Sequence, residues 1–145
     1  MTSEQIIAQL PYGPDFLFVD RIEKLDENSI TGSYHFKGNE YFYPSHFKST
    51  PVTPGVILTE TMAQIGLVSL GIYLISLKQK NLESALIALT STAIDFYLPV
   101  FPNEKIRVHS VKEYFRFNKL KCAVEMRNEK KDLVCKGVIS GMIRF

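Results

Sequence analysis

One long apolar segment constrains the fold of this chain more than any other feature. Residues 54–77, which run PGVILTETMAQIGLVSLGIYLISL, contain a single charged residue, Glu60. A helix that is apolar on all sides is buried, either inside a protein or in a lipid bilayer. Because an unpaired carboxylate is costly to bury there, we expect Glu60 to be paired, protonated or functional.

A membrane span is the rival interpretation of this segment, since about 20 apolar residues are enough to cross a bilayer. Glu60 and Gln64 lie inside it, and the chain after residue 85 alternates like soluble β-strand. We therefore predict no membrane span. Without a charged and apolar N-terminal leader in the sequence, we expect a cytoplasmic protein.

Length and composition favour one compact domain over residues 1–145. The chain is 46% hydrophobic and 22% charged, which is enough apolar material for a buried core. A net charge of +2 is too small to indicate nucleic-acid binding. Cys122 and Cys135 lie in apolar, strand-like segments, so we expect buried free thiols rather than metal ligands or a disulfide. We expect neither a metal nor a cofactor.

The remaining sequence predicts an α+β layout dominated by antiparallel strands. Thr2 or Ser3 caps a short helix that runs through Leu10, and the polar stretch 78–84 ends the long helix. Strands are expected at residues 16–25, 29–37, 86–97, 105–117, 119–127 and 133–144. One buried helix with mostly antiparallel strands indicates a sheet wrapped around that helix.

Residues 46–60, HFKSTPVTPGVILTE, bring the groups of a reaction centre into one short stretch. Thr53 is a good N-cap and Pro54 suits the first helical position, which makes Gly55 the second residue with a free N–H. Such an N–H can hold a developing oxyanion. His46 exchanges protons near neutral pH, and Glu60 is a second acid or base, with Gln64 on the same helix face at i+4.

The order of short motifs resembles a known family. The motifs are Leu10-Pro11, Phe16-x-x-Val19-Asp20-Arg21, Asn39-Glu40-x-Phe42, His46-Phe47, Pro51-Val52-x-Pro54-Gly55-Val56 and Glu60-x-Met62-Ala63-Gln64. This order resembles the 3-hydroxyacyl-acyl-carrier-protein dehydratases of fatty-acid synthesis, which have the hotdog fold. The resemblance covers most of the chain, and its most specific part is residues 39–64. It implies a hotdog fold here, with an antiparallel sheet around one long central helix.

The resemblance also implies roles for individual residues. His46 would remove the C2 proton of a 3-hydroxyacyl thioester, and Glu60 would protonate the departing 3-hydroxyl, giving a trans-2-enoyl thioester. Gly55 N–H would hold the thioester carbonyl, Gln64 would orient Glu60, and Phe47 would contact substrate. The substrate would arrive on acyl carrier protein. The enzyme would be a homodimer, or a trimer of such dimers, in which His46 and Glu60 of one site come from different chains.

Several positions depart from the family pattern. Ser45 replaces the usual Gly before the histidine, and Lys48-Ser49 replaces the usual Pro-Gly after His-Phe. Tyr12-Gly13 stands where His-Arg is usual, and Tyr97-Leu98 stands where a basic pair is typical. None of these changes removes a proposed catalytic group. They favour a changed substrate or carrier, as in a specialised lipid or polyketide-like pathway.

Two other functions stay open at this point. A hotdog acyl thioesterase would hydrolyse the thioester with a carboxylate-activated water. A catalytically weak hotdog subunit would bind an acyl chain or complete a heterodimer. The altered loop at Ser45 and Lys48-Ser49 supports this interpretation.

Overall fold

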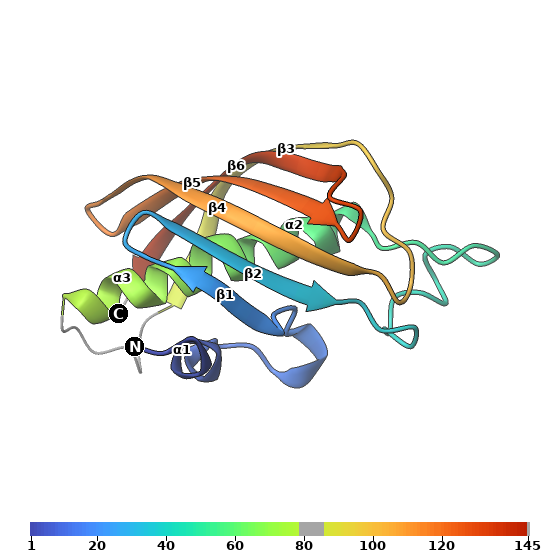
Figure 1. The fold of residues 1–145 in the computed structure, drawn as a ribbon, viewed down its shortest axis with the longest axis horizontal. Helices are drawn as coiled ribbons and strands as arrows, with labels where there is room; N and C mark the ends of the chain where they lie inside the picture. Colours follow the sequence, from blue (N-terminus) through green and yellow to red (C-terminus); the bar gives the residue numbers. More distant parts are fainter. Residues whose placement is uncertain (79–85, 145) are drawn as a thin grey trace.

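A curved antiparallel sheet wraps around one central helix (Figure 1). The structure is a computed structural model that describes residues 1–78 and 86–144. Within these residues the strand order is β1-β2-β4-β5-β6-β3. The elements are α1 (Ser3–Gln9), η1 (Pro14–Phe16), β1 (Arg21–Leu25), β2 (Ser29–His35), α2 (Gly55–Ala63), η2 (Gln64–Ser69), α3 (Leu70–Leu77), β3 (Leu86–Phe96), β4 (Lys105–Arg116), β5 (Lys119–Asn128) and β6 (Leu133–Arg144). The predicted sheet around a helix is confirmed.

The central helix is continuous from Gly55 to Leu77, but the six residues of η2 in its middle are π-helical. By length and composition it is the one helix among the described residues that is long and apolar enough to cross a membrane. However, 78% of its most apolar window is buried inside the fold. A mostly buried segment of this kind is what the core helix of a globular protein looks like.

Glycine allows the helix to lie unusually close to the sheet. A Cβ on Gly66 would lie 2.5 Å from Cγ1 of Val124 on β5 and 2.9 Å from Cβ of Ser110 on β4. Gly32 of β2 faces the helix in the same way, since its Cβ would lie 2.8 Å from Ile65. Larger residues at positions 32 and 66 would push the two layers apart.

The inner face of the sheet carries the alternating apolar residues that the sequence predicts. On β5, Leu120, Cys122, Val124 and Met126 are all buried. Both cysteines are free and buried, which confirms that prediction. Desolvation by burial raises the pKa of Cys122 to about 11 and that of Cys135 to about 12.

Strand β3 forms one end of the sheet and pairs with β6 alone among the described residues. Nearly all of its residues are exposed, including the large apolar side chains of Leu86, Leu89 and Phe96. A long apolar edge strand is a ready template for pairing with another chain.

The predicted strand at residues 16–25 is wrong over its first half. Residues Pro14–Phe16 form a 3-10 turn, and β1 begins only at Arg21. The physical reason is that the side chain of Gln64 occupies the backbone groups there, accepting from Phe18 N–H and donating to the Phe16 carbonyl. These groups are therefore not free to pair with a neighbouring strand.

The start of the long helix also differs from the prediction. Pro54 is the N-cap and Gly55 is the first helical residue, while Thr53 makes no cap. Its hydroxyl instead pairs with the hydroxyl of Tyr43 at 2.8 Å. The helix ends at Leu77 with Lys78 as C-cap, and positions 79–84 of the predicted polar terminator lie outside the described residues.

The other helix and strand predictions agree with the structure to within about two residues at each end. The short N-terminal helix is capped by Thr2, whose side chain accepts from Gln5 N–H in a capping box.

Candidate active site

Gly55 opens the central helix with a backbone N–H that has no acceptor among the described residues. The chain enters the helix in a fixed position because Thr53 N–H donates to the Val100 carbonyl at 2.8 Å. The ring of Phe96, at the end of β3, lies over the α-carbon of Gly55. The free N–H and the helix dipole together make this point suitable for a carbonyl oxygen that gains negative charge.

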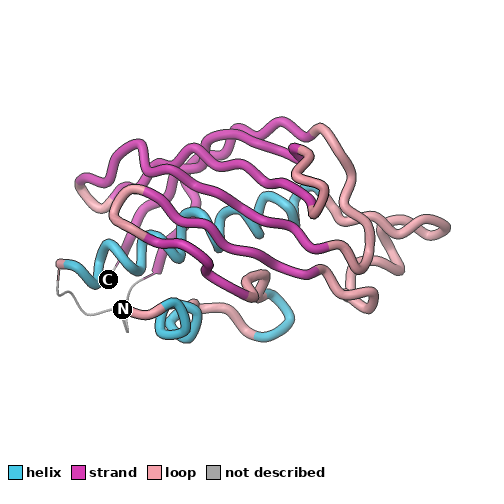
Figure 2. Tube along the Cα trace, in the orientation of Figure 1, coloured by secondary structure: helices cyan, strands magenta, loops and turns pink. Residues whose placement is uncertain are grey.

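His46 lies on the long loop between β2 and α2, which projects beyond the end of the sheet (Figure 2). Its Nδ1 lies 2.8 Å from the Val52 carbonyl, and its backbone carbonyl accepts from Val52 N–H at 2.9 Å. A carbonyl can only accept, so Nδ1 carries the proton of the neutral ring and Nε2 keeps a lone pair. The contact therefore selects the tautomer in which Nε2 can act as a base.

Phe47 stacks on the His46 ring, with ring centroids 3.9 Å apart and an interplanar angle of 27°. The peptide bond between the two residues is cis. The Phe47 side chain is 57% exposed. It thus presents an apolar surface beside the base, at the position where substrate contact was predicted.

Side-chain hydrogen bonds fix the His46 loop, one to β2 and another within the loop, and the sequence analysis assigned neither contact a role. Glu40 accepts from the Tyr34 hydroxyl at 2.5 Å and from Lys37 N–H at 3.2 Å. Closer to the helix, the Tyr43 hydroxyl pairs with Thr53. Glu40 belongs to the Asn39-Glu40-x-Phe42 motif, and that motif was the sequence signal that could have indicated its role.

Glu60 and Gln64 meet as the i+4 spacing predicts. Gln64 Nε2 donates to Glu60 Oε1 at 3.0 Å, and Gln64 is completely buried. Glu60 is half-buried and forms no ion pair among the described residues. The Glu60 side chain is thus held by a neutral amide and not by a cation.

The backbone of residues 16–18 decides which way the Gln64 amide points. Phe18 N–H donates to Oε1 at 2.8 Å, while Nε2 donates to the Phe16 carbonyl at 2.9 Å. If the amide were flipped, Nε2 would face the Phe18 N–H, another donor, and Oε1 would face the Phe16 carbonyl, another acceptor. Nε2 therefore faces Glu60, and Glu60 Oε1 is an acceptor. This leaves Oε2 of Glu60 as the oxygen that is available to substrate.

Within one chain, some of the predicted site residues contact each other and others do not. Glu60 and Gln64 are hydrogen-bonded, and Gly55 lies on the same helix. His46 stacks only on Phe47, and no hydrogen bond or ion pair links His46 to Glu60 in the described part of the chain.

Tyr12 is a neighbour of Glu60 that the sequence analysis noted only as a departure from the family pattern. Its ring packs against Phe16, with centroids 6.3 Å apart. Burial, and then the negative charge of Glu60, raise the pKa of Tyr12 well above its usual value. A neutral phenol therefore lies beside the carboxylate.

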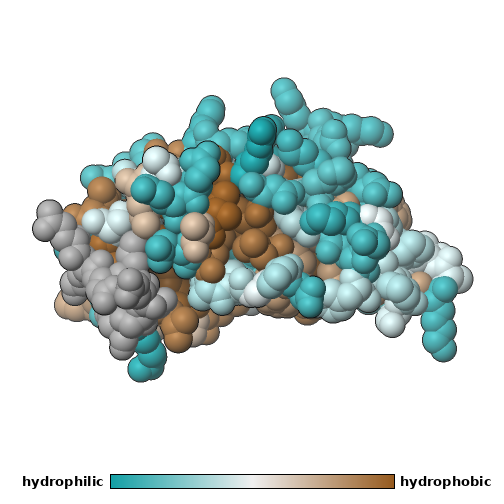
Figure 3. Space-filling model, turned by 90° about the horizontal axis from the view of Figure 1, so that it is seen from below, coloured by the Kyte–Doolittle hydropathy of each residue, from teal (hydrophilic) through white to brown (hydrophobic). Residues whose placement is uncertain are grey.

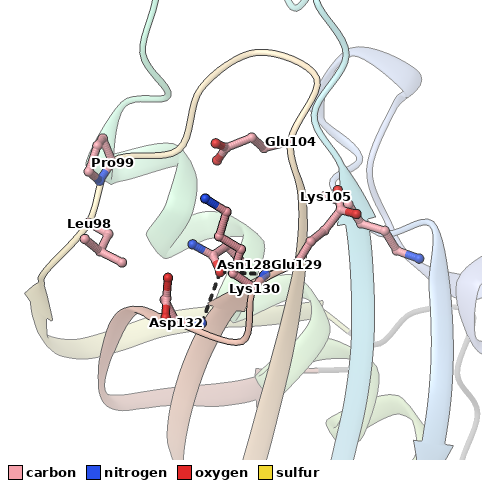
Figure 4. Close-up of a pocket in the computed structure, with 8 residues that line it drawn as sticks. All are labelled: Leu98, Pro99, Glu104, Lys105, Asn128, Glu129, Lys130 and Asp132. Atoms are coloured by element: carbon pink, nitrogen blue, oxygen red, sulfur yellow. Dashed lines mark hydrogen bonds between the residues drawn. The ribbon is translucent and has the colours of Figure 1, made fainter.

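Of two clefts in the described part of the monomer, one contains a predicted site residue and the other does not. A cleft of about 410 Å³ on the His46 loop includes Phe47, Tyr41 and Lys48. Another, of about 350 Å³, lies between residues 98–105 and the β5–β6 turn and contains no predicted site residue (Figure 4). There Asn128 Oδ1 accepts from the backbone N–H of Lys130 and of Asp132, which closes the turn.

Titratable side chains do not gather into a metal site in residues 1–78 and 86–144. No group of three or more His, Cys, Asp or Glu residues there is arranged to hold an ion.

Comparison with known proteins identifies relatives of this chain. The model of the FabA-like domain matches residues 10–134. A 3-hydroxyacyl-(acyl-carrier-protein) dehydratase FabZ from Rickettsia typhi is 36% identical over 115 residues, covering 79% of this chain and 77% of that protein. The protein of the same name from Nitratidesulfovibrio vulgaris is 35% identical over 107 residues, covering 72% and 67%.

Solved structures share the architecture at low sequence identity. The dehydratase heterocomplex ApeI:P from Xenorhabdus doucetiae has a TM-score of 0.82 and 11% identity, covering 100% of this chain and 93% of that one. A thioesterase from Haemophilus influenzae, HI1161, has a TM-score of 0.71 and 14% identity, covering 99% and 91%. At such identities the likeness concerns the fold alone, and it confirms the predicted hotdog fold.

Proposed function

We propose that this chain, which belongs to the FabA-like family and to its 3-hydroxyacyl-(acyl-carrier-protein) dehydratases, converts a 3-hydroxyacyl thioester to a trans-2-enoyl thioester. The observation that carries the assignment is the contact of His46 Nδ1 with the Val52 carbonyl at 2.8 Å. It leaves Nε2 as a base, which a dehydratase needs for an α-proton.

His46 begins the proposed reaction by taking the C2 proton of the thioester on Nε2. The electron pair of the C–H bond moves toward the thioester carbonyl, whose oxygen gains negative charge. The N–H of Gly55 and the helix dipole stabilise that charge. Because an α-proton of a thioester is only weakly acidic, base and oxyanion donor must act together.

Glu60 completes the reaction on the other side of the substrate. Hydroxide is a poor leaving group, so Glu60 donates a proton to the 3-hydroxyl as the C3–O bond breaks, and water leaves. The C2–C3 double bond forms with the same electron pair. Gln64 holds Oε1 of Glu60, so the proton passes from Oε2. Phe47 stacks on the base and would contact the acyl chain.

A second copy of the chain would complete the site. His46 and Glu60 are not linked within one chain, and β3 presents an open apolar edge that ends at Phe96, above Gly55. Hydrophobic surface is also exposed on the face that Figure 3 shows. Pairing of β3 with β3 of another copy would cover this edge and bring two helix starts together. We propose a homodimer with composite sites, and a trimer of dimers remains a prediction.

Acyl carrier protein is the proposed carrier, because the relatives are named for it. Tyr97 and Leu98 are exposed where a basic pair is typical, so a carrier that docks there would meet a more apolar surface than the family pattern implies. The reaction needs no redox group, so the proposal includes no cofactor. A cytoplasmic location and a role in fatty-acid or specialised lipid synthesis belong to the same proposal.

The experiment that tests this function separates it from its alternatives. The protein is incubated with a 3-hydroxyacyl thioester, carried on acyl carrier protein or on coenzyme A, and both enoyl product and free thiol are measured. Enoyl product supports the dehydratase. Free thiol without enoyl product would instead establish a thioesterase, and neither product would indicate an acyl-binding partner subunit.

A further inference from the structure

The central helix changes from α to π directly after the turn that carries Glu60. Short π-helical stretches inside α-helices are rare and frequently lie at functional sites. This one, η2, begins at Gln64, the residue that holds Glu60. Its position connects an unusual piece of backbone with the proposed acid.

Two buried serines bind the backbone of η2. Ser69 Oγ donates to the Gln64 carbonyl at 2.7 Å, and Ser110 Oγ of β4 donates to the Gly66 carbonyl at 2.8 Å. Both serines are completely buried. Because these hydroxyls are shielded from water, the two hydrogen bonds have no solvent competitor.

The serines and the residue 16–18 segment fix Gln64 from two directions. Ser69 holds its main-chain carbonyl, whereas Phe16 and Phe18 hold its side-chain amide. Ser110 ties the same turn to the sheet at Gly66, where a Cβ could not fit. The rotation of this helical turn relative to the sheet is thus set by contacts outside α2.

We infer that Ser69 and Ser110 are positioning residues, which hold η2 in its π-helical form so that the Gln64 amide stays on Glu60. The inference rests on the proposed function only in taking Glu60 as the acid. If η2 relaxed to a regular α-helix, the helix on one side of it would rotate by about 100° relative to the other, the angle per residue of an α-helix. The Gln64 amide would then lose its hydrogen bond to Phe16, Phe18 or Glu60.

The test compares Ser69→Ala and Ser110→Ala with wild type. We expect the kcat of dehydration to fall about 10- to 100-fold, the scale of a small misplacement of a reacting group, with KM within about twofold of wild type because the substrate-contacting groups remain. Ser69→Thr keeps the hydroxyl and should restore kcat. The matched control is Ser33→Ala, since Ser33 is a buried serine of β2 whose hydroxyl has no partner among the described residues.

A second readout does not depend on activity. The side-chain amide NMR signals of Gln64 should shift in Ser69→Ala and Ser110→Ala but not in Ser33→Ala. Wild-type values of either kcat or the Gln64 signals in both serine variants would overturn the inference. If Ser110→Ala fails to fold, Ser110→Cys, similar in size and a weak donor, replaces it. If the wild-type protein forms no enoyl product, the proposed function fails, and the Gln64 signals alone decide the positioning role.

Discussion

The ring of Phe96 on edge strand β3 covers Gly55 at the start of the central helix. A Cβ on Gly55 would lie 3.4 Å from two carbons of that ring, which is ordinary van der Waals contact. The space between ring and helix start therefore accepts a methyl group but no more. In the proposed reaction the thioester carbonyl binds at the Gly55 N–H, beside this ring.

Gly55→Ala should therefore fold normally and lose activity. Alanine is a better helix former than glycine and keeps the N–H, but its methyl narrows the approach to the donor. We expect kcat/KM to fall about 10- to 100-fold, as for a misplaced reacting group, at an unchanged melting temperature. Gly13→Ala is the control, because a Cβ there meets nothing within 4 Å. Wild-type kcat/KM for Gly55→Ala would argue against an oxyanion site at this N–H.

Gln64→Leu should lower stability as well as activity. The change leaves the Phe18 N–H and the Phe16 carbonyl without their partner, and an unsatisfied buried polar group costs about 1–3 kcal/mol. The free energy of unfolding from urea titration measures this loss. Gln9→Leu, at an exposed position of α1, should change it by less than about 0.5 kcal/mol. Equal stabilities of the two variants would contradict the described amide contacts.

Glu60→Gln keeps the size of the side chain and an oxygen for Gln64, but it cannot donate a proton as an acid. Dehydration should fall about 10²- to 10⁴-fold, the usual contribution of a general acid. Exchange of the C2 proton with solvent, which depends on His46, should remain measurable. A dehydration rate within about tenfold of wild type would show that another group is the acid.

Stability should decline in mildly alkaline solution because both cysteines resist ionisation in the fold. Their pKa values rise to about 11 and about 12, so between pH 9 and those values the unfolded chain releases thiol protons that the folded chain keeps. The unfolded state then binds fewer protons, and the free energy of unfolding falls as pH rises. Urea midpoints at pH 8 and pH 10 measure the effect. The double variant Cys122→Ala/Cys135→Ala should show a smaller decline, and an equal decline would exclude the thiols.

Shared active sites can be tested by mixing inactive chains. His46→Ala and Glu60→Ala homodimers should each be inactive, whereas exchange of subunits should rebuild one intact site in each heterodimer. Recovery of up to about half of wild-type activity per heterodimer is the statistical expectation for one site of two. Demonstrated subunit exchange without any recovery would show that each site lies within one chain.

Local sequence patterns predicted the structural features that depend on residues close together in the sequence. The apolar run predicted the central helix, and the i+4 spacing predicted the contact between Gln64 and Glu60. Both follow from helix geometry. The strand at residues 16–25 was wrong, since its backbone groups bind a side chain distant in sequence.

The π-helical stretch and the missing Thr53 cap could not be predicted, because both depend on side-chain contacts made only in the folded chain. Ser110 stabilises η2 from a strand that lies far along the chain, and the Tyr43 hydroxyl occupies the one group that Thr53 has for capping. Neither contact has a local sequence signal. The tautomer of His46 likewise depends on the fold of its loop, which brings the Val52 carbonyl to Nδ1.

The most direct measurement of the central claim is the rate at which His46→Ala forms trans-2-enoyl thioester, beside wild type and the control His109→Ala. His109 is an exposed histidine of β4 that contacts Thr31, so its loss should leave the rate unchanged. If His46 is the base, His46→Ala should lose at least about 10²-fold in dehydration and also lose exchange of the C2 proton. Dehydration by His46→Ala at the wild-type rate would contradict the account.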